Sequence, residues 1–259
     1  MNQMTQPNDI IQQAAHAIHD ASKIAVLTGA GVSKESGVPT FRDAQSGLWA
    51  QYDPQELATP QAFQRDPKLV WDWYTWRREL VAQSAPNPGH VALAQLQVLV
   101  PQMHIITQNV DDLHEQAGSR EVIHLHGNIA QNKCFDNCQG DPTVIDIRTL
   151  EDANATPPRC PHCGAYVRPD VVWFGEILPD HALQSAIYHS EQCNVMLVVG
   201  TSGLVSPASR LPSIAKRAGA TVIEVNPDHS MITPLADIKL EGPSGEMLPQ
   251  VIEALHGLA

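Results

Sequence analysis

Short apolar runs alternate with stretches of helical periodicity along most of this chain, and this alternation restricts its fold more than any other feature. Four runs rich in Val, Ile and Leu are short enough for strands buried on both faces. Between them, apolar residues recur at the spacing of one helix face. This order predicts an α/β fold: a Rossmann-like parallel sheet with crossover helices on both faces. The expected strands are residues 24–28, 104–107, 195–199 and 221–225, and the expected helices are 10–21, 179–191, 207–218 and 245–258.

Two regions interrupt the alternation. Residues 41–88 show no strand pattern but a Trp- and Tyr-rich helical stretch, and residues 129–168 are polar and rich in Cys, Asp and Pro. We expect these inserts, one helical and one a zinc ribbon, to form a small domain above the carboxyl edge of the sheet. Residues 1–40, 89–128 and 169–259 then form the Rossmann-like domain, and a chain of 259 residues can bury such a core.

Charge and hydropathy exclude several classes of protein. The formal net charge is −12, whereas proteins that bind the phosphate backbone of nucleic acids usually carry basic stripes. No apolar run approaches the roughly 20 residues that span a bilayer. Residues 1–10 resemble neither a secretion signal nor a transit peptide. We expect a monomeric cytoplasmic protein that binds neither nucleic acid nor membranes and whose acidity is compatible with basic peptide partners.

A glycine-rich loop follows the first predicted strand. Thr28-Gly-Ala-Gly-Val-Ser33 lets the backbone turn tightly and brings N–H groups close to a pyrophosphate. Lys34 stands where the G-x-G-x-x-G pattern has its third glycine. The loop alone is therefore compatible with an ordinary strand–turn–helix connection, and it disfavours hydride transfer by a dehydrogenase. A polar extension with Phe41 and Arg42 at its far end could close over a bound cofactor.

Polar residues also follow other strands at this edge of the sheet. Thr107-Gln-Asn-Val-Asp111 ends one strand, where open α/β sheets bind ligands, although Asn109 or Asp111 could simply cap the next helix. His124-Leu-His126 ends another. Histidine is suited to proton transfer near neutral pH, and two histidines on one strand face could alternatively share a metal. Gly200-Thr-Ser202 suits a phosphate and Asn226 suits a ribose or adenine edge, but each could also be a turn.

Four of the five cysteines form two close pairs, Cys134 with Cys138 and Cys160 with Cys163. Such pairs on two knuckles are the usual framework of a tetrahedral zinc site, and four protein ligands leave no open position for catalysis. A redox pair and unliganded thiols are the alternatives. The longer spacing in the first pair predicts a distorted knuckle. Cys193 precedes an apolar run and is expected to be a buried small hydrophobe.

Taken together, these motifs resemble the sirtuin family. The family pattern GAGxSxxSGxPxFR is met at every fixed position from Gly29 to Arg42, TQN-x-D-x-LH is met through His114, and the HG pair falls at His126. The resemblance extends from Gly29 to Pro249. Its departures are the spacing of the first cysteine pair and Asp43, where the family has a small residue.

The resemblance implies a role for each of these residues. His126 and Asn109 would be catalytic, and the four cysteines would hold a structural zinc. Val171–Glu176 resembles the family's strand that pairs with the substrate backbone, so the acylated peptide would contact Val172, Phe174, Gly175 and Glu176. NAD would be bound by Gly29, Ala30, Gly31, Ser33, Ser36, Phe41, Arg42, Gln108, Asn109, Val110, Asp111, Gly200, Thr201, Ser202, Asn226, Pro227, Asp228 and Ser244.

The helical stretch Trp71–Arg78 resembles class III sirtuins, in which a Tyr-x-x-Arg motif binds acidic acyl chains. Tyr74 and Arg77 are three residues apart and share a helix face. A guanidinium can hold the distal carboxylate of succinyl-lysine through two parallel hydrogen bonds, and Ala44 would leave space for the longer chain. The alternative is an amphipathic helix with a snorkelling cation.

The reaction implied by the resemblance is NAD-dependent removal of acyl groups from lysine side chains of proteins. The amide oxygen attacks C1′ of the nicotinamide ribose, nicotinamide leaves, and His126 activates a ribose hydroxyl. The products are free lysine, nicotinamide and O-acyl-ADP-ribose. Two rival functions would use the same pocket: mono-ADP-ribosyl transfer to protein, and NAD sensing by a non-catalytic binding module. The general base argues against the second, because binding alone needs none.

Overall fold

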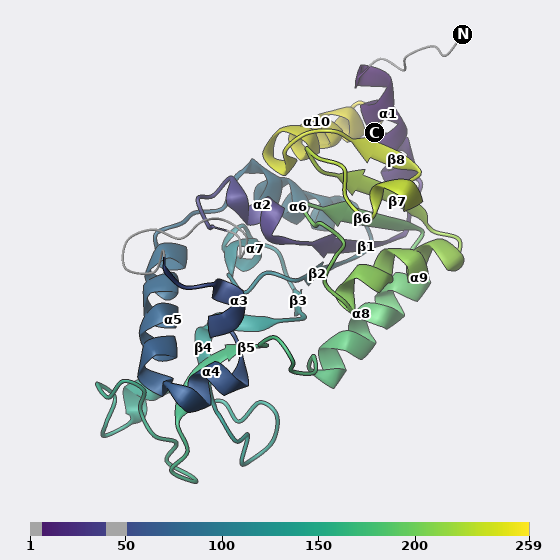
Figure 1. Ribbon diagram of the computed structural model, residues 1–259. Helices are drawn as coiled ribbons and strands as arrows, with labels where there is room; N and C mark the ends of the chain where they lie inside the picture. The colour runs from purple at the N-terminus through teal and green to yellow at the C-terminus, as the bar shows by residue number, and fades with distance from the viewer. Residues whose placement is uncertain (1–6, 40–50, 259) are drawn as a thin grey trace.

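A six-stranded parallel sheet forms the centre of the molecule, which a computed structural model describes over residues 7–39 and 51–258. The strand order is β3-β2-β1-β6-β7-β8, so the chain leaves β1 in one direction along the sheet and β6 in the other (Figure 1). The strands are β1 (Lys23–Thr28), β2 (Gln102–Thr107), β3 (Ile123–His124), β6 (Val195–Val199), β7 (Thr221–Val225) and β8 (Ile238–Leu240).

Both faces of the sheet are covered by helices, which is why its central strands are apolar without alternation. On β1, Ile24 and Val26 pack into one hydrophobic cluster with α1, α6 and α10, and Ala25 and Leu27 pack into another with α8 and α9. The predicted fold class is thereby confirmed. The helices are α1 (Pro7–His19), α6 (Pro88–Leu99) and α10 (Ser244–His256) on the first face, and α8 (Asp180–Gln192) and α9 (Leu211–Arg217) on the second.

Short elements complete the sheet unit and were not all predicted. Strands β6 and β7 match the expected ranges, and β3 corresponds to the short strand expected to end at His124–His126. Strand β8 was missed because three residues are too few to show a period. The short helices of the sheet unit are α2 (Ala30–Lys34) and α7 (Leu113–Gln116), and its described 3₁₀ helices are η3 (Ala208–Arg210) and η4 (Thr233–Leu235). A further 3₁₀ helix, η2 (Ile147–Thr149), lies in the insert of residues 129–168.

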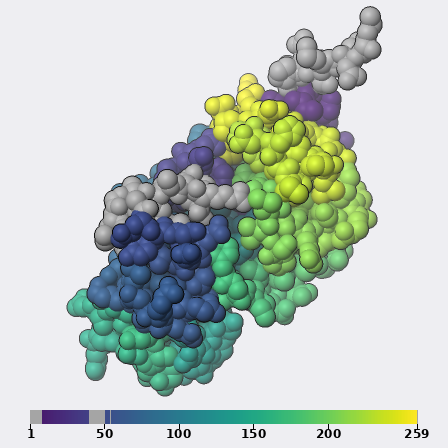
Figure 2. Space-filling model, viewed as in Figure 1, coloured from purple at the N-terminus to yellow at the C-terminus, as the bar shows by residue number. Residues whose placement is uncertain are grey.

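A smaller unit lies beside the carboxyl edge of the sheet. It consists of α3 (Pro54–Leu57), α4 (Pro60–Arg65), α5 (Pro67–Ala82) and the antiparallel pair β4 (Gly127–Cys134) and β5 (Val167–Val171). Two of its helices start at a capping residue followed by proline: the Thr59 hydroxyl accepts from Ala62 N–H, and the Asp66 carboxylate accepts from Leu69 N–H. In Figure 2 this unit is the blue and teal lobe beside the green and yellow one.

The smaller unit has its own aromatic core. Phe63, Trp73, Tyr74 and Trp173 are buried together, with the Phe63 and Trp173 rings 5.3 Å apart between centroids. Trp173 belongs to this core although it lies outside the inserts 41–88 and 129–168, and the expected division of the chain stays a prediction. Within the described ranges, no helix has both the length and the apolar character needed to cross a membrane.

Candidate active site

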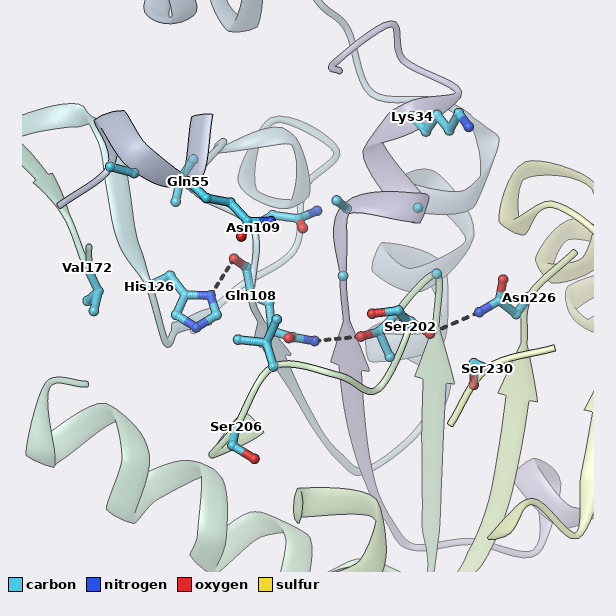
Figure 3. Close-up of a pocket in the computed structure, with 18 of the residues that line it drawn as sticks. Lys34, Gln55, Gln108, Asn109, His126, Val172, Ser202, Ser206, Asn226 and Ser230 are labelled. Atoms are coloured by element: carbon cyan, nitrogen blue, oxygen red, sulfur yellow. Dashed lines mark hydrogen bonds between the residues drawn. The ribbon is translucent and has the colours of Figure 1, made fainter. Parts of the chain in front are cut away.

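A cavity of about 780 Å³ opens at the carboxyl ends of β1, β2, β6 and β7, between the sheet and the smaller unit (Figure 3). This is where open α/β sheets bind ligands. Most of the residues that the sequence assigned to NAD or to the acylated peptide line this cavity. These are Gly29, Ala30, Gly31, Gln108, Asn109, Val110, Gly200, Thr201, Ser202, Asn226, Pro227, Asp228 and Ser244, together with His126, Val172, Phe174, Gly175 and Glu176.

Glycines allow two loops to meet backbone to backbone on the floor of this cavity. Gly31 N–H donates to the carbonyl oxygen of Gly200 at 2.8 Å. A Cβ on Gly31 would stand 2.7 Å from that oxygen, and a Cβ on Gly200, whose φ is +61°, would stand 2.5 Å from the nitrogen of Val32. No side chain can therefore stand between the loops after β1 and β6, and the backbone itself forms the surface.

A chain of hydrogen bonds ties three strand ends together. The Gln108 amide donates to the Thr201 hydroxyl at 2.9 Å, and the Asn226 amide donates to the Thr201 carbonyl oxygen at 3.0 Å (Figure 3). The loops after β2, β6 and β7 are thus held in fixed relation.

His126 lies in the wall of the cavity, where β3 gives way to β4. Its Nδ1 is 2.8 Å from the carbonyl oxygen of Gln108, which can only accept a hydrogen bond (Figure 3). Nδ1 therefore carries the hydrogen, and Nε2 of the neutral ring carries the lone pair. Burial lowers the pKa of His126 from its ordinary value of 6.5, and the bond to Gln108 offsets this only in part. The neutral ring is a proton acceptor at physiological pH.

Three predicted cofactor residues lie behind the cavity wall. The Asn109 amide donates to the Ser33 hydroxyl at 2.9 Å, and Ser33 also bonds the carboxylate of buried Asp111. Burial raises the pKa of Asp111 despite that bond and a second one from Leu113 N–H at 3.2 Å, which gives Asp111 a share in starting α7. The Ser36 hydroxyl accepts from the Asn87 amide at 3.0 Å. Ser33 and Asp111 thus act on the site through Asn109.

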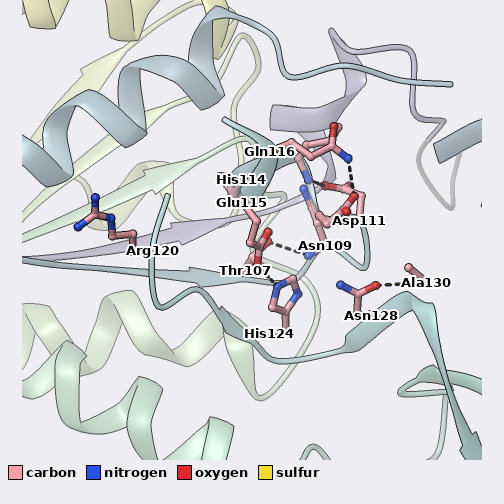
Figure 4. A network of polar contacts seen from close by, with 12 residues as sticks. Thr107, Asn109, Asp111, His114, Glu115, Gln116, Arg120, His124, Asn128 and Ala130 are labelled. Atoms are coloured by element: carbon pink, nitrogen blue, oxygen red, sulfur yellow. Dashed lines mark hydrogen bonds and ion pairs between the residues drawn. The ribbon is translucent and has the colours of Figure 1, made fainter. Parts of the chain in front are cut away.

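His124 is paired with an acidic residue beside the cavity wall. Its Nε2 lies 2.6 Å from the Glu115 carboxylate (Figure 4). Burial would lower the pKa of His124, but the hydrogen bond and charge of Glu115 outweigh burial and raise it. Across the described part of the chain, the four cysteines form the one group of three or more potential ligands that could share an ion, so a metal held by His124 and His126 finds no support.

The segment after β5 approaches His126 from the smaller unit. Strand pairing ends at Val171, and the predicted strand does not continue to Glu176: Val172 N–H donates to the carbonyl oxygen of His126 at 2.9 Å, and residues 173–176 form a turn. Phe174 N–H donates to the Ala58 carbonyl oxygen at 2.9 Å. The Glu176 carboxylate bonds Arg168 within the protein.

Tyr74 and Arg77 lie beneath the cavity wall and not in it. The Tyr74 hydroxyl accepts from the Trp173 indole N–H at 2.9 Å, and the Arg77 guanidinium carbon is 5.2 Å from the centroid of the Trp73 ring. Burial raises the pKa of Tyr74 to about 12 and lowers that of Arg77. Ala44, Phe41 and Arg42 fall outside the described residues.

The four cysteines converge as the sequence predicted. All four sulfur atoms lie within 4.8 Å of one another, with Cys134 and Cys163 at 3.5 Å and Cys138 and Cys160 at 3.8 Å. Zinc–thiolate bonds of about 2.3 Å at tetrahedral angles place sulfur atoms about 3.8 Å apart, so the group fits zinc. The extra residue of the first knuckle is absorbed at Asn137, which has a φ of +46°.

Comparison with known proteins decides the family. The Sir2 family model matches residues 29–207, which is more than half of the chain. The chain belongs to the Sir2 family. A relative named NAD-dependent protein deacylase 2, from Pyrobaculum aerophilum, is 49% identical over 245 residues, which cover 95% of this chain and 93% of the relative.

Solved Sir2 structures share the whole architecture. The crystal structure of a Sir2 homologue in complex with NAD superposes with a TM-score of 0.86 at 44% identity and covers 96% of this chain and 95% of that one. A Sir2 protein bound to a myristoylated histone peptide superposes with a TM-score of 0.75 at 36% identity and covers 96% and 98%.

The cavity of this Sir2 protein also contains residues that the sequence did not single out. Trp173 lies between two residues that were predicted, and His229 and Ser230 directly follow predicted Asp228, so proximity along the chain could have indicated them. Gln55 and Ala58 come from the smaller unit, and no site role was predicted for either. The remaining unpredicted lining residues are Lys34, Glu35, Val171, Leu178, Val205, Ser206, Val225 and Pro243.

Proposed function

We propose that this Sir2 protein is an NAD-dependent lysine deacylase acting on acylated proteins, with free lysine, nicotinamide and O-acyl-ADP-ribose as products. The observation that carries the proposal is the place of His126. Its ring lies in the cavity wall between the glycine loops and the Val172–Glu176 segment, in the tautomer that leaves Nε2 free to take a proton. Relatives named NAD-dependent protein deacylase support it at 49% identity.

The exposed main chain of the glycine loops makes the cavity suitable for NAD. Where Gly31 and Gly200 meet, no side chain covers the main chain, so a diphosphate could approach backbone N–H groups directly. Asn226 and Ser244 line the cavity and would contact the adenosine, and Asn226 lies at the end away from His126, whereas Asn109 lies close to His126 (Figure 3). Bound NAD supplies an activated glycosidic carbon with nicotinamide as its leaving group.

His126 would act as the general base. Nε2 accepts a proton from a hydroxyl group brought into the cavity, and the Gln108 carbonyl holds the resulting imidazolium through Nδ1–H. Asn109, oriented by Ser33, fixes the reacting groups beside this ring. The zinc held by the four cysteines has no open position, so its role would be structural.

We further propose a preference for acidic acyl groups, and this rests on Tyr74 and Arg77. Their positions support this proposal: they lie one turn apart on α5, and the Tyr74 hydroxyl accepts from the indole of Trp173, which lines the cavity. A desolvated guanidinium attracts a carboxylate more strongly than an exposed one does. Desuccinylase and demalonylase activity, a cytoplasmic location and a monomeric state stay predictions from the sequence.

The decisive experiment compares one peptide in its acetyl-lysine and succinyl-lysine forms, incubated with the protein with and without NAD. Mass spectrometry should show NAD-dependent loss of the acyl group with an equal amount of O-acyl-ADP-ribose, and faster loss from the succinyl form. Transfer of labelled ADP-ribose to protein without loss of acyl groups would contradict deacylation and support ADP-ribosyl transfer.

A further inference from the structure

A buried arginine lies beneath the segment that approaches His126. Arg168 on β5 is 1% exposed. Its guanidinium donates to both oxygens of Glu176 at 2.5 and 3.0 Å and to the carbonyl oxygen of Val171 at 2.6 Å, and it stacks 3.2 Å from the centroid of the Trp173 ring. Its Nε–H has no acceptor within the part of the chain that the structure describes. Burying a guanidinium is costly unless its charge is matched, so Glu176 is committed to this pair.

The same pair sets the shape of the cavity wall. The Glu176 carboxylate accepts from Trp173 N–H at 2.7 Å, and Glu176 N–H donates to the Trp173 carbonyl oxygen at 3.0 Å. These two bonds close a turn in which Gly175 takes a φ of +88°. Both ends of the turn therefore depend on where Arg168 holds the carboxylate.

The turn connects the two parts of the proposed substrate site. On one side, Val172 N–H donates to the carbonyl oxygen of His126, and the two neighbouring residues both line the cavity (Figure 3). On the other side, the Trp173 indole donates to the Tyr74 hydroxyl at 2.9 Å. A shift of the Trp173 ring would move both the peptide-facing backbone and the hydroxyl of Tyr74.

We infer that Arg168 is a positioning residue for the acylated lysine, acting through Glu176 and the indole of Trp173. Arginine is needed because only its planar fork can bond both carboxylate oxygens and a carbonyl oxygen while stacking on a ring. This inference rests on the proposed deacylase function, and it assigns Glu176 to shaping the site in place of direct contact with the peptide.

The inference is tested by measuring the KM for the acylated peptide and the KM for NAD separately. In Arg168→Lys, the KM for an acetyl-lysine peptide should rise roughly tenfold because charge-assisted bonds are lost, while the KM for NAD stays within about twofold. Arg159→Lys is the matched control: Arg159 also stacks on a ring, 3.5 Å from the centroid of Tyr166, but it is exposed and lies away from the cavity. It should leave both constants unchanged. Equal rises in both constants for Arg168→Lys would overturn the inference.

A binding cycle separates this inference from the proposed reaction. Calorimetry measures the affinity for the acetyl-lysine peptide of the unmodified protein, Arg168→Met, Glu176→Gln and the double variant. If Arg168 acts through Glu176, the double variant should lose no more affinity than Arg168→Met alone. Additive losses, or a soluble Glu176→Gln protein with unchanged peptide affinity, would overturn the inference. Peptide binding with this coupling but no turnover would uphold it and contradict only the deacylase proposal. Absence of peptide binding by the unmodified protein would overturn both.

Discussion

The Nδ1 atom of His126 and the carbonyl oxygen of Gln108 lie 2.8 Å apart, and this one contact determines which ring nitrogen can accept a proton. Gln108 is itself held, because its side-chain amide donates to the Thr201 hydroxyl. The general base of the proposed reaction is therefore oriented by the loops after β2 and β6.

Replacing this base should remove turnover without removing the fold. In His126→Ala we expect NAD-dependent deacylation to fall by at least roughly a hundredfold, since general-base catalysis typically contributes that much. Zinc content and melting temperature should stay near those of the unmodified protein. His16→Ala is the control: His16 is exposed on α1, away from the cavity, and its loss should leave activity unchanged. A near-normal rate in His126→Ala would contradict the mechanism.

At acidic pH, the rate of deacylation should depend on the protonation of the His126 ring. Burial lowers the pKa of His126 from 6.5, and the reaction needs the neutral form. The rate should therefore be constant above that pKa and fall as the pH drops through it, with the midpoint of the acid limb of kcat/KM below pH 6.5. Stopped assays across the pH range measure this. An acid limb centred above 6.5 would point to another group.

Acyl preference should depend on Arg77. In Arg77→Met we expect desuccinylation to fall roughly tenfold or more, because a bidentate bond to the distal carboxylate is lost. Deacetylation should change by less than about threefold. Arg78→Met is the matched control on the same helix: Arg78 donates to the Ile129 carbonyl oxygen, so its loss should affect both activities alike. Equal losses in Arg77→Met would mean that Arg77 only stabilises α5.

Replacing one cysteine of the four-cysteine cluster should destabilise the protein far more than replacing Cys193, which lies outside it. In Cys160→Ser we expect loss of bound zinc and a fall in melting temperature of about 10 °C or more, because a structural metal contributes directly to folding. Cys193 lies outside the cluster, and its thiol donates to the Ser190 carbonyl oxygen, so Cys193→Ser should retain zinc. Metal analysis and thermal melts measure both. A zinc-free Cys160→Ser with an unchanged melt would contradict a structural role.

The meeting of the two glycine loops should control NAD affinity. A methyl group on Gly31 would stand 2.7 Å from the Gly200 carbonyl oxygen, so Gly31→Ala must push the loops apart. We expect the KM for NAD to rise roughly tenfold or more, as misplacement near the reacting groups often does. Gly257→Ala at the end of α10 meets only the Ala254 carbonyl oxygen at 3.3 Å and should leave the KM unchanged. An unchanged KM in Gly31→Ala would place the cofactor elsewhere.

Periodicity and motif spacing predicted the large sheet and most of the cavity, because buried strands such as β6 and β7 are continuous apolar runs. The β4–β5 pair was missed for physical reasons. A bulge between Asn128 and Asn132 breaks the alternation that would mark β4. Lys133 is also buried there, and it is neutralised by Asp170 at 3.2 Å. A buried ion pair of this kind looks like two solvated charges in the sequence.

The role of Glu176 could not be predicted either, because it depends on a buried ion pair. Its position in the segment suggested contact with substrate, but the partner that holds its carboxylate is Arg168, eight residues earlier. Nothing in the sequence distinguishes a buried arginine from a snorkelling one. Likewise, only the fold shows that neither Tyr74 nor Arg77 lines the cavity and that the Tyr74 hydroxyl is bonded to the indole of Trp173, which does.

Strand β4 begins next to His126 and ends at Cys134, so one continuous stretch of backbone joins the base to the cysteine cluster. A chelator that removes the zinc need not enter the cavity to abolish the activity of this protein. Inactivation would be slow, because its rate would be set by dissociation of the ion from the cysteines and the loss of order in β4 that follows. Raising the concentration of substrate would not reverse that loss.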